Sequence, residues 1–399
     1  PGRRLRPDPG GLPVTTTIRS RRYERGVVLV LVLFYVLLLA TTVATLQRRV
    51  AIDAGIAVNR DRAAAAEALA RGGVRLAQTL LLEDLRLGAG QPGPDSLWDV
   101  WARAGLAPIF VDEEADLSLR LEIEDAAARI NLNAVAGAGG IGLGEAAAGA
   151  EGRTGAQDET PPVEDTGQRR QRRRSQLGGG AGGVEARRLF LTGFLTRVIE
   201  GMPGRPEDKR YVPEELAANL LDWVDEDDVR QGGGGEDDVY QRMEPPYRAA
   251  NRPLLSLDEL RLVEGFDGPL VEALRPYVTV YPLAGAGGVN LNTAPSWVLA
   301  QLTRGSDVSG MRPVEEQDVG RILDARDEGL ICTGAAVGAE CTSVRDLFDG
   351  ESVSPPPLDR SDVFVVRATA RVVDVERRIE AVVDRSDPQQ PQRLSWRVE

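Results

Sequence analysis

The feature that most constrains this chain is an uninterrupted uncharged stretch from Val27 to Leu46. A helix rises about 1.5 Å per residue, so this segment is about 30 Å long and matches the hydrocarbon core of a bilayer. Arginines outnumber acidic residues in the 26 residues before it, a bias that favours a cytoplasmic N-terminus. The sequence therefore predicts one membrane span, with the bulk of the chain on the far side.

The junction before the span carries a second indication. Basic residues are followed by Gly26, and the apolar helix begins at once with Val27. This arrangement is similar to the processing site of type IV prepilins and pseudopilins, in which a dedicated prepilin peptidase cuts after the glycine. The alternatives are a plain single-pass anchor and a cleaved secretory signal, for which the apolar core is too long. We expect cleavage between Gly26 and Val27 and methylation of the new N-terminus.

The helical pattern continues beyond the span to residue 87. We expect one helix over 27–87, embedded in the membrane in its first half and packed on a soluble domain in its second. Steps of four, three and four residues define an apolar seam, formed by Leu69, Gly73, Leu76 and Leu80. This seam is our candidate surface for companion helices. The alternative is that it packs on the sheet of the same chain.

Composition limits the chemistry that the chain offers. Its net charge of −13 argues against a nucleic-acid partner for most of the 399 residues. The sequence has no histidine, which rules out the usual Ser-His-Asp, Cys-His and His-metal arrangements. It also lacks the Gly-Lys-Ser/Thr end of a phosphate-binding loop. We expect no enzymatic activity, and a carboxylate-dependent metal hydrolase ranks last because no general base accompanies the acidic residues.

Cys332 and Cys341 are the only cysteines. The predicted topology places them in an oxidising compartment, so we expect a disulfide between them. The alternative is a pair of free thiols.

Alternating apolar residues predict strands near both ends of the chain, with a mostly helical middle. We expect a small antiparallel sheet assembled from both ends and packed on the long helix, which is a pilin-like α+β layout. The helices in the middle include 213–224 and one that starts at Pro295, capped by Asn292 or Thr293. The expected segments are a basic leader at 1–26, the span and pilin helix at 27–87, the first part of the sheet domain at 88–135, a disordered loop at 136–183, an inserted α-helical domain at 184–283, a second helical unit with the cysteine loop at 284–361, and strands completing the sheet at 362–399.

Eight carboxylates lie within 17 residues, between Asp222 and Asp238. Such a density of hard oxygen ligands suits calcium, although the spacing is not that of an EF-hand loop. The alternative is a solvated acidic face at the end of a helix.

Several motifs together carry a family resemblance. Behind the prepilin-like helix the chain resembles the type II secretion minor pseudopilin K family, general secretion pathway protein K, in the stretches INLNAV (130–135), LLDWVDEDD (220–228), EDDVY (236–240), PPYRAANRPLLSLDELRLVEGF (245–266) and VNLNTAP (289–295). The resemblance implies a non-enzymatic subunit at the tip of a periplasmic pseudopilus, anchored in the bacterial inner membrane. Its implied partners are the minor pseudopilins I and J and the major pseudopilin.

The resemblance also implies details of the sites. Most pilins carry Glu at the fifth mature position, where this chain has Leu31, and members of the K family lack that Glu as well. The inserted helical domain is implied to be SAM-like or helix-hairpin-helix-like and to hold a structural calcium ion. The ligands implied by matching positions are Asp225, Asp227, Glu236 and Asp237.

The strongest rival is a membrane-anchored DNA receptor. VNLNTAP and the later SVRDLF stretch at 343–348 also look like the helix-hairpin-helix domain of competence DNA-binding proteins. Such domains hold phosphate on backbone amides of a Gly-rich hairpin with basic residues beside it. The first candidate hairpin is the glycine pair Gly265 and Gly268 in LRLVEGFDGPLVEALRPYV (260–278). It is flanked by Glu264, Asp267 and Glu272, which disfavours DNA.

Overall fold

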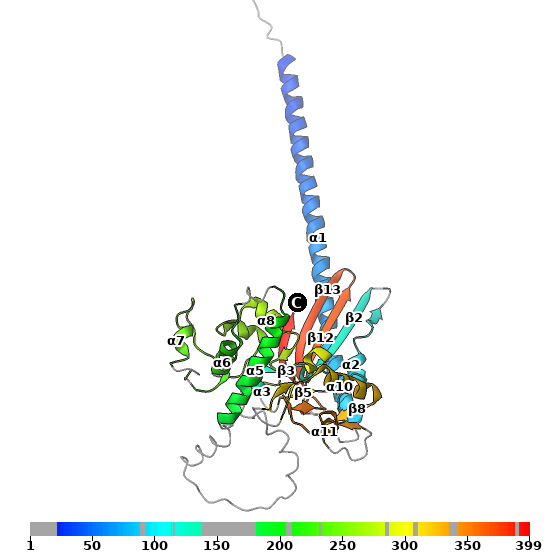
Figure 1. Cartoon of the computed structure of the whole chain (residues 1–399). Coiled ribbons are helices and arrows are strands. Elements are labelled where there is room, and N and C mark those ends of the chain that lie inside the picture. Colours follow the sequence, from blue (N-terminus) through cyan, green and yellow to red (C-terminus); the bar gives the residue numbers. More distant parts are fainter. Residues whose placement is uncertain are drawn as a thin grey trace, which may run out of the picture. The chain divides into compact units, whose positions relative to one another are not determined.

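A computed structural model gives the arrangement of most of the chain (Figure 1). It divides into two compact units, Pro1–Ala64 and Ala65–Glu399, each of which is described by itself. The residues that the structure describes are 22–87, 93–112, 114, 116–137, 181–204, 210–227, 229–230, 234–283, 287–305, 310–334, 341–387 and 391–399.

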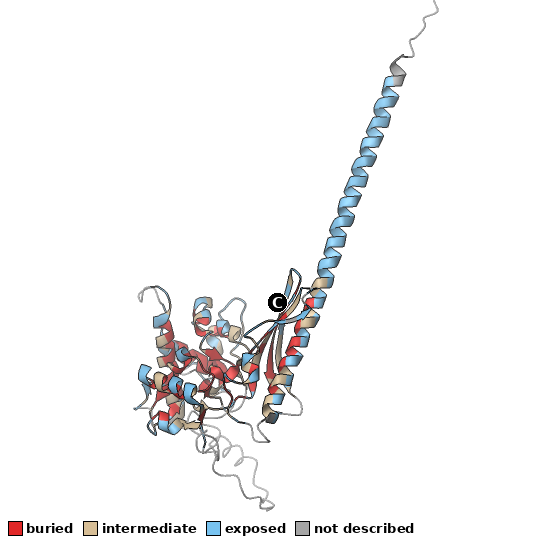
Figure 2. Ribbon diagram, turned by 90° about the vertical axis from the view of Figure 1, so that its right-hand side faces the viewer, coloured by how far each residue is buried: buried red, intermediate tan, exposed pale blue. Residues whose placement is uncertain are grey.

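The first unit is the N-terminal part of helix α1, which runs over Arg22–Leu87. Every residue from Gly26 to Asp61 is exposed, including the large apolar side chains of the predicted span (Figure 2). Within the described part of the chain, this is the helix long and apolar enough to cross a membrane. A solvent-exposed apolar surface of this length fits a single-pass anchor.

The second unit contains a five-stranded antiparallel sheet in the order β1-β2-β12-β13-β14. The expected assembly from both ends is confirmed, because β2 pairs with β12 although more than two hundred residues separate them in sequence. The strands are β1 (Ile109–Asp112), β2 (Leu117–Asp125), β12 (Val363–Val372), β13 (Val375–Asp384) and β14 (Gln392–Val398).

The C-terminal part of α1 packs on one face of this sheet, as the pilin-like layout predicts. Its buried apolar side chains recur at steps of four, four, three and four, and three of the five belong to alanine, so the helix lies close to the strands. Trp101, in the short helix α2 (Val100–Arg103), closes this core edge-on against Phe364, with ring centroids 5.0 Å apart. The buried face of α1 consists of Ala66, Ala70, Val74, Ala77 and Leu81, together with Gly73.

A helical domain is inserted between β2 and β12 and appears in green in Figure 1. Helices α5 and α6 pack against each other, and α6 begins with Pro213 at a position where the missing N–H costs nothing. The segment 257–262 forms a 3-10 helix. The elements are α3 (Leu132–Ala136), α5 (Ala181–Gly201), α6 (Pro213–Val224), α7 (Asp237–Tyr240), η3 (Leu257–Leu262) and α8 (Gly268–Leu274).

The expected loop at 136–183 is shorter at both ends. Ala136 is the last residue of α3, and α5 already begins at Ala181. Its interior, residues 138–180, lies outside the described residues.

The second helical unit shares one continuous hydrophobic core with the inserted domain, so the expected boundary at 284 is not a break in packing. Its longest helix is α10 (Glu316–Glu328), which a capping box opens. The other elements are β5 (Val289–Asn290), α9 (Ser296–Leu299), β6 (Thr303–Arg304), β7 (Arg312–Pro313), β8 (Leu330–Cys332), β9 (Cys341–Ser343), α11 (Val344–Leu347), β10 (Val353–Ser354) and β11 (Pro357–Leu358). Two further short elements, β3 (Ile130–Asn131) and β4 (Val278–Thr279), pair in parallel, and η1 (Ala126–Ala128) follows β2.

The two Asn-Leu-Asn motifs have the same structural role. Asn133 binds both backbone groups of Leu254 and the carbonyl of Val280, at 2.7–2.9 Å. Asn292 likewise binds the N–H and the carbonyl of Ile331, both at 2.9 Å. Each asparagine therefore fixes a distant segment by mimicking a strand partner. The predicted capping of a helix by Asn292 or Thr293 is wrong, because Pro295 is the N-cap of α9.

Candidate metal centre and other sites

The acidic cluster forms where the end of α6 meets the start of α7. Asp222 lies in the last turn of α6, and Asp225 ends the helix with an extended backbone. The chain then folds back through a bridge between Val229 and Gly235, which returns Glu236 to the end of α6. As a result, carboxylate oxygens of Asp222, Asp225 and Glu236 all lie within 4.8 Å of one another.

Burial makes this cluster electrostatically costly without a cation. Asp222 and Glu236 are each 3% exposed. Burial, together with the neighbouring charges of Asp227 and Asp222, raises the pKa of Asp225 to about 7. Its Oδ1 atom is buried and has no hydrogen-bond partner among the described residues. Three converging carboxylates, one with an orphaned oxygen, are the kind of oxygen donors that a hard divalent cation such as calcium prefers.

Aromatic packing fixes the geometry of the cluster. Trp223 and Tyr240 meet edge-on with centroids 5.1 Å apart, and Tyr247 stacks on Tyr240 at 5.4 Å. Burial also raises the pKa of Tyr240 to about 12, so this phenol stays neutral beside the acidic residues. Because these rings connect α6 and α7, they hold Asp222 and Glu236 in place on either side.

The structure brings together only two of the four expected calcium ligands, Asp225 and Glu236. Asp227 is turned to the backbone N–H of Val229, at 2.9 Å. Asp237 accepts a hydrogen bond from the N–H of Ala249 at 3.1 Å and lies 3.6 Å from the guanidinium of Arg248.

Asp222 completes the cluster instead. It precedes Asp225 by three residues, a spacing that places both side chains on one side of the helix end. This spacing is the sequence signal that would have identified it.

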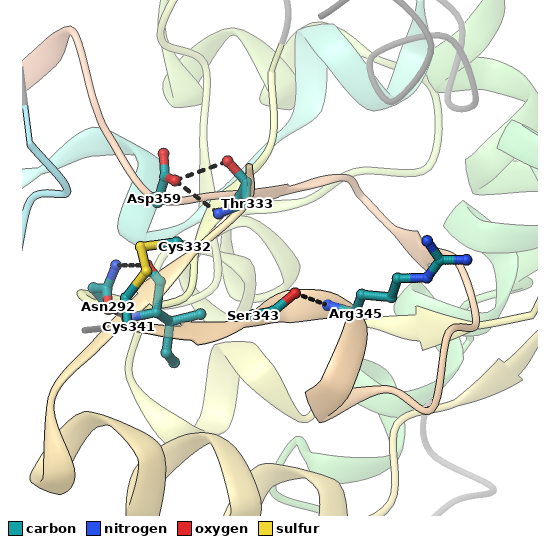
Figure 3. The surroundings of a disulfide bond; sticks show 8 residues. Asn292, Cys332, Thr333, Cys341, Ser343, Arg345 and Asp359 are labelled. Atoms are coloured by element: carbon teal, nitrogen blue, oxygen red, sulfur yellow. Dashed lines mark hydrogen bonds between the residues drawn. A yellow bond between two sulfur atoms is a disulfide. The ribbon is translucent and has the colours of Figure 1, made fainter. Parts of the chain in front are cut away.

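The cysteine pair lies in the second helical unit. Cys332 of β8 and Cys341 of β9 form a disulfide, with their Cα atoms 5.9 Å apart. Figure 3 shows the surrounding contacts, in which the carboxylate of Asp359 accepts hydrogen bonds from the N–H and the hydroxyl of Thr333 at 2.7 and 2.8 Å. The two short parallel strands are therefore tied covalently, while Asp359 holds the end of β8 to the segment after β11. Residues 335–340 lie outside the described part.

The predicted helix seam is split by the structure. A Cβ atom on Gly73 would lie 2.8 Å from Leu119 Cδ1 and 3.0 Å from Ala368 Cβ, so Gly73 faces the chain's own sheet. Leu69 and Leu80 are half-buried against the same core. Leu76 alone of the four is exposed, with 39% of its surface accessible, and its role in partner contact stays a prediction. At the predicted processing site, Gly26 and Val27 are exposed on α1.

The fold defines a class of protein: a pilin-like protein in which a long, partly apolar helix packs on an antiparallel sheet interrupted by a helical insertion. The family model "Type II secretion system (T2SS), protein K" matches residues 200–283, the part of the insertion that contains the acidic cluster. The resemblance to this family is thereby confirmed, and the chain is a relative of type II secretion system protein K.

Individual relatives agree with this result. Type II secretion system protein K of Pectobacterium carotovorum subsp. carotovorum is 41% identical over 80 residues, 20% of this chain and 24% of that protein. The Klebsiella pneumoniae protein is 39% identical over 85 residues, 21% of this chain and 25% of that protein. These two matches span about a quarter of the relatives' length. The Pseudomonas aeruginosa protein is 29% identical over 286 residues, 71% of this chain and 69% of that protein.

A solved structure shows the same fold. It is the crystal structure of the GspK-GspI-GspJ complex from the type 2 secretion system of enterotoxigenic Escherichia coli. The matched chain is 21% identical, the TM-score is 0.50, and the match covers 85% of this chain and 99% of that one.

Proposed function

We propose that this chain is a minor pseudopilin at the tip of the type II secretion pseudopilus, where it supports export of folded proteins across the outer membrane. The observation that carries the proposal is the protein K insertion placed inside a pilin-like sheet. A long helix with an exposed apolar first part fits a subunit that is held in the membrane before assembly and packs among companion helices afterwards. The role is mechanical and not enzymatic.

The proposed location is the bacterial inner membrane, with the N-terminus in the cytoplasm and the bulk of the chain in the periplasm. Prepilin peptidase is expected to cut between Gly26 and Val27, and the new N-terminus is expected to be methylated. The proposed partners are the minor pseudopilins I and J and the major pseudopilin. The match to a chain from a complex of GspK, GspI and GspJ supports the first two.

The experiment that tests this function is mass spectrometry of the N-terminus, from cells with and without active prepilin peptidase. Cleavage after Gly26 that depends on the peptidase is the expected result. Substitution Gly26→Val should block it, whereas Gly55→Val should not, although both glycines lie on α1 with open space around them. An uncut N-terminus in the presence of the peptidase would contradict the pseudopilin proposal and favour a plain anchored periplasmic domain.

We further propose that the acidic cluster holds a structural calcium ion. Asp222, Asp225 and Glu236 would supply the carboxylate oxygens. The bound cation would offset the mutual repulsion of these buried groups and tie the start of α7 to the end of α6. Support comes from the convergence of the three side chains and from the orphaned Oδ1 of Asp225.

Calorimetric titration of the full chain, after treatment with a chelator, tests the calcium site. The wild-type chain should bind calcium, and Asp222→Asn should weaken binding by about tenfold or more, since a charged ligand is lost. Asp237→Asn is the matched control, because Asp237 points to Ala249 and Arg248 instead. No heat at millimolar calcium would refute the site and leave the pseudopilin proposal intact.

The DNA-receptor alternative gains no support from the comparisons. Its first candidate hairpin precedes α8, where the carboxylate of Asp267 accepts a hydrogen bond from the N–H of Leu270 at 3.0 Å and another from the hydroxyl of Tyr211 at 2.8 Å. A carboxylate therefore occupies the place where such a domain would offer its amides to phosphate.

A further inference from the structure

A basic groove lies on the second unit, away from the acidic cluster. It has a volume of about 300 Å³ and runs between the C-terminal part of α1 and the edge strand β14. Three of its six lining residues are arginines, and the others are one amide and two apolar side chains. The groove is lined by Arg71, Val74, Arg75, Gln78, Arg393 and Trp396.

A β-bulge places one of these arginines in the groove. Trp396 pairs with Ala381 and Arg393 with Val383, and the register shifts between them because Leu394 is an extra residue. Ala381 and Val383 both belong to the core beneath α1, so their partners Arg393 and Trp396 share that face. Without the bulge, alternation would put Leu394 beside Trp396 and turn Arg393 to the opposite face. Bulges commonly re-aim a side chain in this way at functional sites.

The charge of the groove is largely uncompensated. Arg71 pairs with Glu67 along α1. Among the described residues, Arg75 and Arg393 form no ion pair. The guanidinium of Arg393 lies 4.7 Å from the centroid of the Trp396 ring, which holds it in position without neutralising it. Two unneutralised arginines together on a chain of net charge −13 indicate a site for an anionic partner.

We propose that this groove binds an acidic peptide segment of a partner protein, with carboxylates on Arg75 and Arg393 and a neighbouring apolar side chain on Val74 and Trp396. Guanidinium groups bind carboxylates through two parallel hydrogen bonds, so a pair of arginines selects for spaced acidic residues. Buried Val74 and half-buried Trp396 give the groove an apolar floor that a small inorganic anion would not use. This binding site is independent of the pseudopilin proposal.

The test is fluorescence anisotropy with the full-length chain in neutral detergent micelles. The probe is a short labelled peptide of alternating glutamate and leucine, and its glutamine counterpart is the control peptide. We expect saturable binding of the glutamate peptide, weakening as salt is added, and at least about tenfold weaker binding of the glutamine peptide. Arg75→Gln and Arg393→Gln should each weaken binding about fivefold or more.

Matched controls separate the groove from general charge. Arg242→Gln removes an exposed arginine of the inserted domain and should leave binding unchanged. Equal affinity of the wild-type chain and both groove variants would overturn the proposal, as would equal affinity for the two peptides. Displacement of the peptide by equimolar inorganic phosphate would also overturn it, and so would tighter binding of duplex DNA than of the peptide. Each of these results is separate from cleavage at the N-terminus, so the two proposals fail independently.

Discussion

The two adjacent glycines of α1 allow a sharp test of how this helix packs. A Cβ atom on Gly73 would lie 2.8 Å from Leu119 Cδ1 and 3.0 Å from Ala368 Cβ, whereas a Cβ atom on Gly72 would meet nothing within 4 Å. Alanine at either position should gain about 0.8–1.0 kcal/mol from helix propensity. Gly72→Ala is therefore expected to stabilise the domain by about 1 kcal/mol.

At Gly73 a packing cost opposes this gain. The end of Leu119 can rotate away, but the Cβ atom of Ala368 is fixed to the backbone of β12. Overpacking of this kind costs about 1–3 kcal/mol, so Gly73→Ala should be neutral or destabilising by up to about 2 kcal/mol. The two variants should therefore differ by about 1–3 kcal/mol.

Hydrogen exchange of the full chain, followed by mass spectrometry on peptides from β12, measures this difference locally. Exchange in β12 should be about 5- to 150-fold faster in Gly73→Ala than in Gly72→Ala, since about 1.4 kcal/mol corresponds to a factor of ten. Equal protection in the two variants would refute the close packing of α1 on β12. Gly73 would then be available to a partner helix.

Four further outcomes are expected. The pKa of Asp225 is raised from 3.8 to about 7, so its contribution to the stability of the calcium-free chain should be full below about pH 3.8 and lost as the pH rises to about 7. Thermal melts with and without chelator should therefore show that calcium stabilises the chain mainly at the alkaline end of this range. Asn133→Ala should cost about 3 kcal/mol in denaturant titrations, because backbone groups of Leu254 and Val280 lose their buried partner. Leu76→Asp should reduce co-purification with the proposed partner pseudopilins while changing stability by less than about 0.5 kcal/mol, since Leu76 is exposed; full recovery would exclude this position from the interface. Reduction of the disulfide should lower stability by about 2–3 kcal/mol, and two thiols titrating without reductant would contradict the bond.

The sheet and the long helix were predictable because their signals are local. Alternation in β2, β12 and β13 and the apolar run of α1 each follow from a few consecutive residues. The wrong cap assigned to Asn292 shows the limit of this reasoning. Its side-chain amide donates a hydrogen bond to the carbonyl of Ile331, 39 residues away, and no local pattern predicts such a contact.

The location of the candidate site was predictable from the sequence, but the residues that form it were not. Asp225 and Glu236 were found from the density of carboxylates and the family resemblance. Asp222 lies in the cluster but was not among the predicted ligands, and the predicted ligand Asp237 lies outside the cluster, because the fold of the chain between Asp225 and Glu236 decides which side chains converge. The basic groove depends on the bulge at Leu394, which the strand pattern of 393–398 does not reveal.

The central position of β12 has a consequence for how the protein folds. The core over Ala70, Val74 and Leu81 is built from β2 together with β12 and β13, which cover residues 363–384, so these α1 side chains lack much of their partner surface until nearly the whole chain has been synthesised. Pairings between such distant segments form slowly, because loop closure precedes any gain from contact. The inserted domain and the second helical unit share a core that is separate from the core under α1, so they can fold first and bring the two sheet halves together. We therefore expect truncation before residue 363 to leave a folded insertion on an unpaired, aggregation-prone helix and strand.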